Sequence, residues 1–362
     1  MKTKRSKVRY IIKIVLIVIL SLWLIIFIAH KIMTCMELSN MKKEGIYNPV
    51  NTGKYDLNVY LYGNENGKHT IVGMSGQGVN TYSMGLKATV DRFAADNRIA
   101  VVDRAGYGLS DSTTVPQTVE QVVQDYRTAL RRAGCETPYI LVPHSLGALY
   151  ATYWENVYPD EIEGILYLDG SGLGEENSYG SSATLHELLL SALCATGLQR
   201  IFHDSMKGEI SWRNLTLQQE KYAKAMEMHS TYNLAQHSES VHETENFHTV
   251  AKIVKPTDIP KIYVYALPTN REDVIEYLEY RNESYRRAGR KPLYDMNDTA
   301  MIDAKVREFE ESSSNQLRKA SYYCNGLGNC SIRTVGGIHN IYKQKPEELA
   351  ALLAELIAET EK

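Results

Sequence analysis

Residues 139–150 read YILVPHSLGALY. The first four of these residues favour an extended strand, and small and apolar residues then recur at helical spacing through Leu149 and Trp154. A strand, a one-residue corner and a helix in direct succession hold the corner residue on a strained turn that exposes its side chain. The pattern therefore predicts that Ser145 stands at the carboxyl end of a strand with its hydroxyl accessible.

The stretch Pro143-His144-Ser145-Leu146-Gly147 resembles the nucleophile elbow of the alpha/beta-hydrolase family, which normally reads Gly-x-Ser-x-Gly. Proline replaces the first glycine; it is compact, and at a strand end it gives up only one ladder hydrogen bond. The resemblance implies that Ser145 is the nucleophile and that the backbone N–H of Leu146 donates to the oxyanion. It also implies that His144 packs beside the turn rather than reacting.

A second glycine-containing loop, SGQG at residues 75–78, follows an expected strand at 70–74. The corresponding loop of the family normally reads His-Gly-x-Gly, and its x residue donates the other oxyanion N–H. Serine takes the place of histidine in this chain. The resemblance implies that Gln77 is the second donor.

The segment 103–111 reads DRAGYGLSD and follows an expected strand at 98–102. It is similar to the Asp-Arg-x-Gly-x-Gly-x-Ser motif that follows strand four in many alpha/beta-hydrolases. Its two glycines permit the positive φ of a tight loop, and Arg104 can pair with Asp103 or with nearby carbonyls. We expect this motif to be scaffold rather than catalytic.

Strands and helices alternate along the chain after the N-terminal region. We expect strands at 55–63, 70–74, 98–102, 139–142, 165–168, 261–266 and 331–335, and helices at 118–133, from the elbow to about 158, and at 345–359. This order predicts an α/β fold with a mostly parallel sheet and helices on both faces. By resemblance, 55–171 and 259–362 form the alpha/beta-hydrolase core, 172–258 form a helical cap, and 273–320 form a second helical insertion that flanks the cap.

Three residues that follow expected strands complete a catalytic set. Ser145, Asp169 and His339 each come at the carboxyl end of a strand, in the order Ser…Asp…His that this fold uses. In such a triad the histidine takes the serine proton and the acid orients the imidazole. The family usually draws the acid from the loop after the next strand, where the first carboxylates are Glu272 and Asp273. Asp169 is the preferred acid, and these two residues are the alternatives.

The first 32 residues have the pattern of a signal-anchor. Residues 1–9 carry five Lys or Arg and no acid, and residues 10–29 are apolar apart from one lysine and one serine. Twenty helical residues span about 30 Å, the thickness of a bilayer's hydrocarbon core, whereas the apolar core of a cleaved signal peptide is about 7–15 residues long. The alternative of cleavage is therefore disfavoured. We expect a cytoplasmic tail at 1–9, a transmembrane helix at 10–32 and a polar stalk at 33–54, with the rest extracytoplasmic.

The part of the chain beyond residue 32 has a net charge of −10, which disfavours nucleic acid as a partner. Cys324 and Cys330 flank a five-residue loop that either closes as a disulfide outside the cell or leaves two thiols. No cysteine spacing suggests zinc. The cap histidines are expected to be scattered surface residues rather than a metal site: His186, His203, His229, His237, His242 and His248.

Together these features predict a membrane-anchored, extracytoplasmic serine hydrolase that acts on a small-molecule or lipid carboxylic ester and needs no cofactor. Serine at position 145 argues against an epoxide hydrolase or a haloalkane dehalogenase, because their covalent esters need a carboxylate. A peptidase of the proline-iminopeptidase kind is an alternative, and Glu239, Glu243 and Glu245 could then hold the substrate amine. A non-catalytic binding module on the same fold is another. The sequence leaves the oligomeric state open.

Overall fold

One eight-stranded sheet organises the computed structural model, which describes residues 2–173, 185–202, 215–287 and 289–362. The strands are β1 (Pro49–Asn51), β2 (Asp56–Gly63), β3 (Thr70–Met74), β4 (Arg98–Val102), β5 (Tyr139–Pro143), β6 (Ile162–Leu168), β7 (Thr257–Ala266) and β8 (Gly328–Val335). Their spatial order is β1-β2-β4-β3-β5-β6-β7-β8. β2 is antiparallel to β1 and to β4, and every neighbouring pair from β4 to β8 is parallel.

Helices cover both faces of this sheet. One face packs against α3 (Val119–Arg132), α4 (Gly147–Val157) and part of α8 (Leu234–Ile253), and the other packs against α2 (Tyr82–Val90) and α11 (Pro346–Thr360). Successive strand residues alternate between the two cores: Tyr139 and Leu141 of β5 face the first, whereas Ile140 and Val142 face the second. A strand buried on both faces explains why the sequence shows continuous apolar runs here.

The expected strands are all present, but the last three begin three or four residues earlier than expected. Gly164 lies in the early part of β6 and Pro260 lies in β7, and both residue types disfavour a strand when only the sequence is read. The close approach of α11 explains the glycine, because a Cβ there would lie 3.0 Å from the Cγ2 of Thr360.

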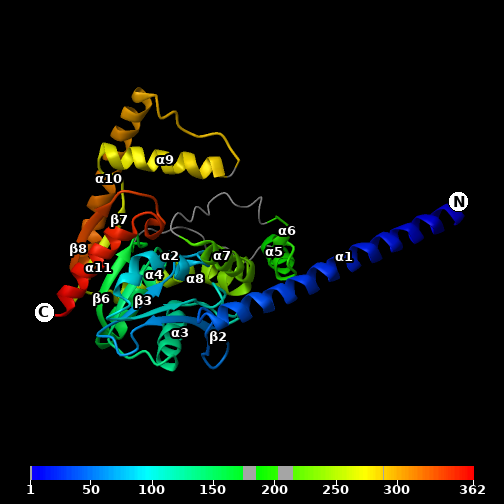
Figure 1. The fold of residues 1–362 in the computed structure, drawn as a ribbon, viewed down its shortest axis with the longest axis horizontal. Helices are drawn as coiled ribbons and strands as arrows, with labels where there is room; N and C mark the ends of the chain where they lie inside the picture. Colours follow the sequence, from blue (N-terminus) through cyan, green and yellow to red (C-terminus); the bar gives the residue numbers. More distant parts are fainter. Residues whose placement is uncertain (1, 174–184, 203–214, 288) are drawn as a thin grey trace.

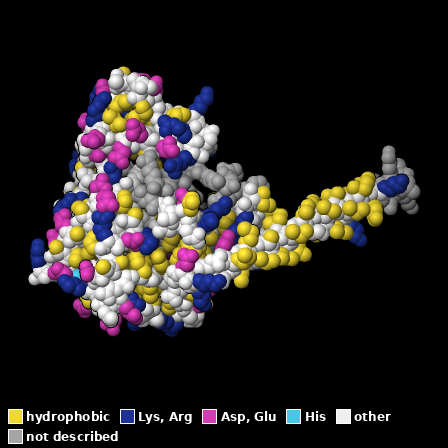
Figure 2. All heavy atoms as spheres, viewed as in Figure 1, with side chains coloured by type: hydrophobic (Ala, Val, Ile, Leu, Met, Phe, Trp, Pro, Cys, Tyr) yellow, Lys and Arg dark blue, Asp and Glu magenta, His cyan; other side chains and the backbone are white. Residues whose placement is uncertain are grey.

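The N-terminal helix is longer than the expected transmembrane segment. α1 runs from Lys2 to Lys43 and extends away from the body of the molecule, with an apolar surface along most of its length (Figures 1 and 2). Among the described residues it is the one helix that is long and apolar enough to cross a membrane. The expected polar stalk at 33–54 is instead the end of α1 followed by the edge strand β1. Met41 and Ile46 are buried against the core, so tertiary packing orders this segment.

Two helical insertions interrupt the core. The described helices of the cap are α5 (Leu185–Ala195), α6 (Gln199–Phe202), α7 (Leu217–Ser230) and α8; His203, the segments 174–184 and 203–214, and the side chain of His186 lie outside the described part. The second insertion consists of α9 (Arg271–Arg287) and α10 (Thr299–Leu327), which project from the body (Figure 1). It has a small core of its own, and α10 continues past the expected end to pack along β8. The insertion is therefore more than a solvated flank of the cap.

Cys324, near the end of α10, and Cys330, on β8, are free thiols in the described structure. Cys324 is buried, and its thiol is hydrogen-bonded with Cys330 on β8. That hydrogen bond, together with burial, raises the pKa of Cys324.

Candidate active site

The residue at the corner between β5 and α4 is Ser145. Its φ of +51° lies in the left-handed region, which is rare for a residue other than glycine and marks a strained position. Two glycines make room for the turn: a Cβ on Gly147 would lie 2.7 Å from the carbonyl oxygen of Met74, and one on Gly76 would lie 2.7 Å from the Cβ of Ser145. The local sequence thus allows β3, β5 and α4 to meet closely around the serine.

A continuous chain of hydrogen bonds links three side chains at the carboxyl ends of the strands. The Oγ of Ser145 is 2.9 Å from the Nε2 of His339, and the Nδ1 of His339 is 2.7 Å from the Oδ2 of Asp169. The other carboxylate oxygen of Asp169 accepts the backbone N–H of Ala266 at 2.9 Å. The acid is therefore held by β7 while it contacts the imidazole.

The structure also separates the three candidate acids. Asp169 follows β6 directly and has a φ of +44°, which turns its side chain toward His339. Asp273 instead accepts from the backbone N–H of Thr269 at 3.1 Å and from the Nδ2 of Asn270 at 2.9 Å, at the start of α9. No hydrogen bond joins His339 to Asp273 or Glu272 in the described structure.

His144, the residue before the serine, lies fully buried beside His339, with the two ring centres 4.7 Å apart. Its Nε2 is 2.9 Å from the backbone oxygen of His339. Burial, reinforced by the neighbouring His339, lowers the pKa of His144 well below its ordinary value. Because the partner is a carbonyl, we assign the proton of the neutral ring to Nε2, which donates to His339. This contact could not be found from the sequence.

The buried side chain of Arg104, which is 2% exposed, holds the loop after β3 in place through hydrogen bonds. Its guanidinium donates to the backbone oxygens of Ser75 and Gly76 and to the Ser75 hydroxyl. The backbone N–H groups of Gln77 and Leu146, the expected oxyanion donors, have no protein acceptor among the described residues. Both remain available to a ligand.

The carboxylate partner of Arg104 is Glu239 of α8, at 2.8 Å, rather than the expected Asp103. Asp103 turns away, because its Oδ2 accepts the Leu109 N–H and the Asn58 amide, each at 3.0 Å. Burial raises the pKa of Asp103 to about 6. The motif correctly indicated that Arg104 binds nearby carbonyls. The carboxylate that pairs with Arg104 belongs to Glu239, 135 positions later in the sequence.

Glu239 is 2% exposed, and it also accepts the hydroxyls of Tyr107 and Tyr150. A carboxylate satisfied by one arginine and two tyrosines is not free to bind a substrate amine. The neighbouring Glu243 accepts from the side-chain amide of Gln77 at 3.2 Å, and burial raises its pKa. The cap helix α8 is thereby tied to the loop that carries the expected oxyanion donor.

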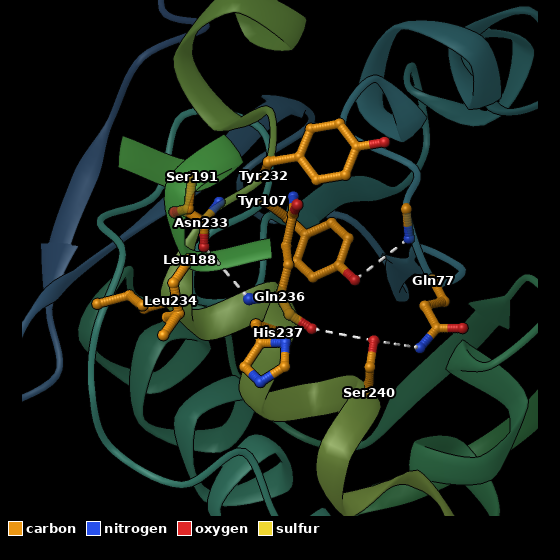
Figure 3. Close-up of a pocket in the computed structure, with 11 residues that line it drawn as sticks. Gln77, Tyr107, Leu188, Ser191, Tyr232, Asn233, Leu234, Gln236, His237 and Ser240 are labelled. Atoms are coloured by element: carbon orange, nitrogen blue, oxygen red, sulfur yellow. Dashed lines mark hydrogen bonds between the residues drawn. The ribbon is translucent and has the colours of Figure 1, made fainter. Parts of the chain in front are cut away.

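Three cavities border Gln77 or the pair Asp169 and His339 in the described structure. One, of about 530 Å³, borders Asp169, His339 and the loop after β7. The other two differ in size and position. The larger one, of about 1320 Å³, borders Asp169 and His339 and has aromatic side chains of β7 and α10 in its lining, among them Tyr265 and Tyr323. The smaller one, which we call the cap cavity, has a volume of about 340 Å³ and lies between α5, the start of α8 and Gln77 (Figure 3). Figure 3 shows the Gln77 amide directed at Ser240 and the Tyr107 hydroxyl directed at the backbone of the same loop.

No family model matches the chain. It is 37% identical over 163 residues to the uncharacterized protein YbdG of Bacillus subtilis, a match that covers 44% of this chain and 49% of YbdG. It is 30% identical over 115 residues to the uncharacterized protein C23C11.06c of Schizosaccharomyces pombe, covering 32% of this chain and 22% of that protein. The chain therefore matches about half of the length of these relatives or less.

Similarity to solved structures extends over most of the chain. The haloalkane dehalogenase DbeA-M1 loop variant of Bradyrhizobium elkanii has a TM-score of 0.54 at 12% identity, covering 87% of this chain and 96% of that chain. The epoxide hydrolase CorEH has a TM-score of 0.53 at 14% identity, covering 86% and 98%. Cfl2 of Burkholderia cenocepacia has a TM-score of 0.55 at 16% identity, covering 85% and 94%. The chain therefore has the alpha/beta-hydrolase fold, preceded by an apolar helix of membrane-spanning length.

Proposed function

We propose that this protein is a membrane-anchored serine hydrolase that cleaves carboxylic esters on the extracytoplasmic side. The observation that carries the proposal is the unbroken Ser145–His339–Asp169 hydrogen-bond chain, which begins at a strained corner residue. A serine hydroxyl is a weak nucleophile at neutral pH, so a base within hydrogen-bond reach is what such chemistry requires. The solved structures with the same fold that are named as hydrolases support a hydrolytic reaction.

The geometry supports a two-step reaction. His339 takes the proton of Ser145 as the serine oxygen attacks the ester carbonyl, and the imidazolium then gives that proton to the departing alcohol. Asp169 holds the ring and stabilises its positive charge. Water, activated by the same histidine, then releases the acid from the acyl-enzyme. The backbone N–H groups of Gln77 and Leu146 would stabilise the negative oxygen in both steps.

The structural neighbours are named for reactions other than ester hydrolysis. A haloalkane dehalogenase or an epoxide hydrolase that forms a covalent ester needs a carboxylate nucleophile, and this chain has serine at the corner. The same structure weakens the peptidase alternative, because Glu239 is already committed to Arg104 and two tyrosines. An ester is therefore the substrate class that we propose.

Membrane anchoring rests on α1. Its apolar stretch is exposed along the helix, and the flanking residues 1–9 are basic, which favours a cytoplasmic N-terminus. A helix with this composition has no partner in the described fold that would cover it, so a bilayer is the environment that suits it.

The test is active-site labelling of the full chain in detergent micelles or vesicles with a fluorophosphonate. Wild type is expected to be labelled, Ser145→Ala and His339→Ala are expected to lose labelling, and Ser314→Ala, an exposed serine on α10, is expected to retain it. A panel of nitrophenyl esters and proline amides then distinguishes esterase from peptidase. Absence of labelling in folded wild-type protein would contradict the proposal and favour a non-catalytic binding module.

A further inference from the structure

The cap helices α5 and α6 expose apolar side chains to the surroundings. Leu188, Leu189 and Leu193 of α5 and Ile201 of α6 are between 45% and 58% exposed. Leu189 and Leu193 are four residues apart and therefore share one side of the helix. We call these four residues the apolar cap face. A group of exposed leucines beside a cavity mouth indicates contact with another apolar phase.

This part of the cap is docked on α1. The guanidinium of Arg200, on α6, forms a two-point ion pair with Glu37 at 2.7 and 2.9 Å and also donates to His30 at 2.8 Å and to Thr34 at 3.1 Å. The turn before α6 approaches the same helix so closely that a Cβ on Gly197 would lie 2.3 Å from the Cβ of His30. A bidentate pair and a glycine contact together specify where the cap meets α1.

The docking position is at the end of the apolar stretch of α1. That stretch ends at residue 29, and a helix rises 1.5 Å per residue, so Glu37 lies about 12 Å beyond it. The polar headgroup region begins where the hydrocarbon core ends and is about 5–8 Å thick on each side. His30 and Thr34, which also contact Arg200, lie about 2 and 8 Å beyond the apolar stretch, within the headgroup region, and Glu37 lies just outside it. The contacts of Arg200 therefore place α6 at the outer part of the headgroup region. At the same level Ile32, Met33 and Met36 of α1 are exposed as well.

We propose that the apolar cap face rests in the interfacial layer of the same bilayer that α1 spans. The proposal rests on the anchoring that is part of the proposed function. The bilayer is the occupant that the structure favours, because the face adjoins the helix that enters it and lies at the depth where it begins.

The consequence concerns the substrate. Leu188 belongs both to the apolar cap face and to the lining of the cap cavity, and Gln77 lines the same cavity. The proposed contact places lipid beside Leu188, and the backbone N–H of Gln77 is the proposed oxyanion donor, so this cavity joins the bilayer side of the cap to the proposed site. It would admit an ester that is dissolved in the membrane. The substrate class is therefore a lipid-borne carboxylic ester rather than a freely soluble one.

Quenching of tryptophan fluorescence by brominated phosphatidylcholine tests the contact without using activity. The full chain is reconstituted in vesicles, and Trp23, within the apolar stretch of α1, serves as the built-in reporter of insertion. In a Trp23→Phe background, Leu189→Trp reports on the apolar cap face, and Tyr322→Trp, which replaces an exposed tyrosine on α10, is the matched control. We expect quenching of Trp23 and of Leu189→Trp above the Trp23→Phe blank, and none for Tyr322→Trp.

The outcomes are distinguishable. Quenching of Trp23 without quenching of Leu189→Trp would overturn the contact and leave the anchor intact. If the tryptophan emission of Leu189→Trp is blue-shifted but not quenched, a second copy of the chain, rather than lipid, covers the apolar cap face. Failure to quench Trp23 would overturn the anchor and the contact together, whereas loss of fluorophosphonate labelling would affect only the proposed reaction.

A second measurement compares two substrates. We expect Leu189→Glu combined with Leu193→Glu to lower hydrolysis of a long-chain ester in vesicles about tenfold or more, since two exposed leucines would lose their proposed contact with lipid. Hydrolysis of a soluble short-chain ester is expected to stay unchanged. Leu293→Glu, in the loop between α9 and α10, is the control and should alter neither rate. Equal loss on both substrates would contradict entry from the membrane.

Discussion

The side chain of His144 holds the backbone of His339, with 2.9 Å between the Nε2 of His144 and the carbonyl oxygen of His339. The histidine that precedes Ser145 thus positions the histidine of the proposed triad. Because burial lowers the pKa of His144, its ring stays neutral and keeps the donating hydrogen while His339 gains and loses a proton. His144 is accordingly a positioning residue that need not touch the substrate.

The first prediction follows from this contact. His144→Phe keeps an aromatic ring in the buried site but removes the donor, so the loop that carries His339 should shift. We expect kcat for a soluble ester to fall about 10- to 100-fold with little change in KM, because small misplacements of a catalytic group are costly. His242→Phe on α8 is the control. A rise in KM with kcat unchanged would contradict a positioning role.

The second prediction concerns the triad acid. Asp169→Asn should lower kcat by roughly 100- to 10,000-fold, because the amide favours the wrong imidazole tautomer and cannot stabilise the imidazolium. Asp273→Asn and Glu272→Gln should change kcat by less than about threefold, since neither side chain reaches His339. Steady-state kinetics of the three variants provide the test. If Asp273→Asn or Glu272→Gln lowered kcat strongly and Asp169→Asn did not, the catalytic acid would instead be in the loop after β7.

The third prediction concerns the buried pair between Arg104 and Glu239. Glu239→Gln leaves a buried guanidinium without its counter-charge, and we expect the free energy of unfolding to fall by about 3–5 kcal/mol. Glu243, on the same helix, accepts from the uncharged amide of Gln77, so Glu243→Gln should lower the free energy of unfolding by less. Urea denaturation of both variants measures the difference. Equal stabilities would show that the pair is dispensable.

The fourth prediction concerns the glycine beneath the serine. A Cβ on Gly76 would lie 2.7 Å from the Cβ of Ser145 and 2.8 Å from the Nδ1 of His144. Gly76→Ala should therefore displace the serine or the loop and lower the rate of fluorophosphonate labelling about 100-fold or more. Gly78→Ala has open space for its Cβ but a φ of +69°, so it separates the effect of backbone strain from that of steric contact.

The fifth prediction concerns pH and stability. Burial lowers the pKa of His229, whose Nδ1 is 3.2 Å from the carbonyl oxygen of Gly108. The folded protein keeps this ring neutral while the unfolded chain takes up a proton below about pH 6.5, so the contribution to stability is present above that pH and is lost as the pH falls. His229→Asn keeps a donor and removes the titration. Its unfolding free energy should fall less steeply than that of wild type between pH 7 and pH 5, and parallel curves would contradict the assignment.

Features that depend on neighbouring residues could be predicted from the sequence alone. The strand–corner–helix pattern around Ser145, the glycine loops after β3 and β4, and the apolar run of α1 are local, so composition and spacing are enough to predict the fold and the position of the serine. At Gly164 local preference was misleading, because pairing with Ile140 of β5 outweighs propensity. Pro260 lies where the register between β7 and β8 shifts, between Thr257 and Lys261, and an irregularity of this kind tolerates proline.

Contacts between groups that are distant in the sequence depend on the three-dimensional packing. For His339 the sequence favoured Asp169 but left Glu272 and Asp273 open, and the contact is with Asp169, 170 residues earlier. The acid for Arg104 comes from 135 residues later, and the cap is held to α1 across 163 residues by the Arg200–Glu37 pair. Each of these pairs brings together charged or polar side chains whose local sequences fit solvent exposure equally well. Their partners are set by how the parallel strands align their carboxyl ends and by where the cap packs, and no local pattern records either arrangement.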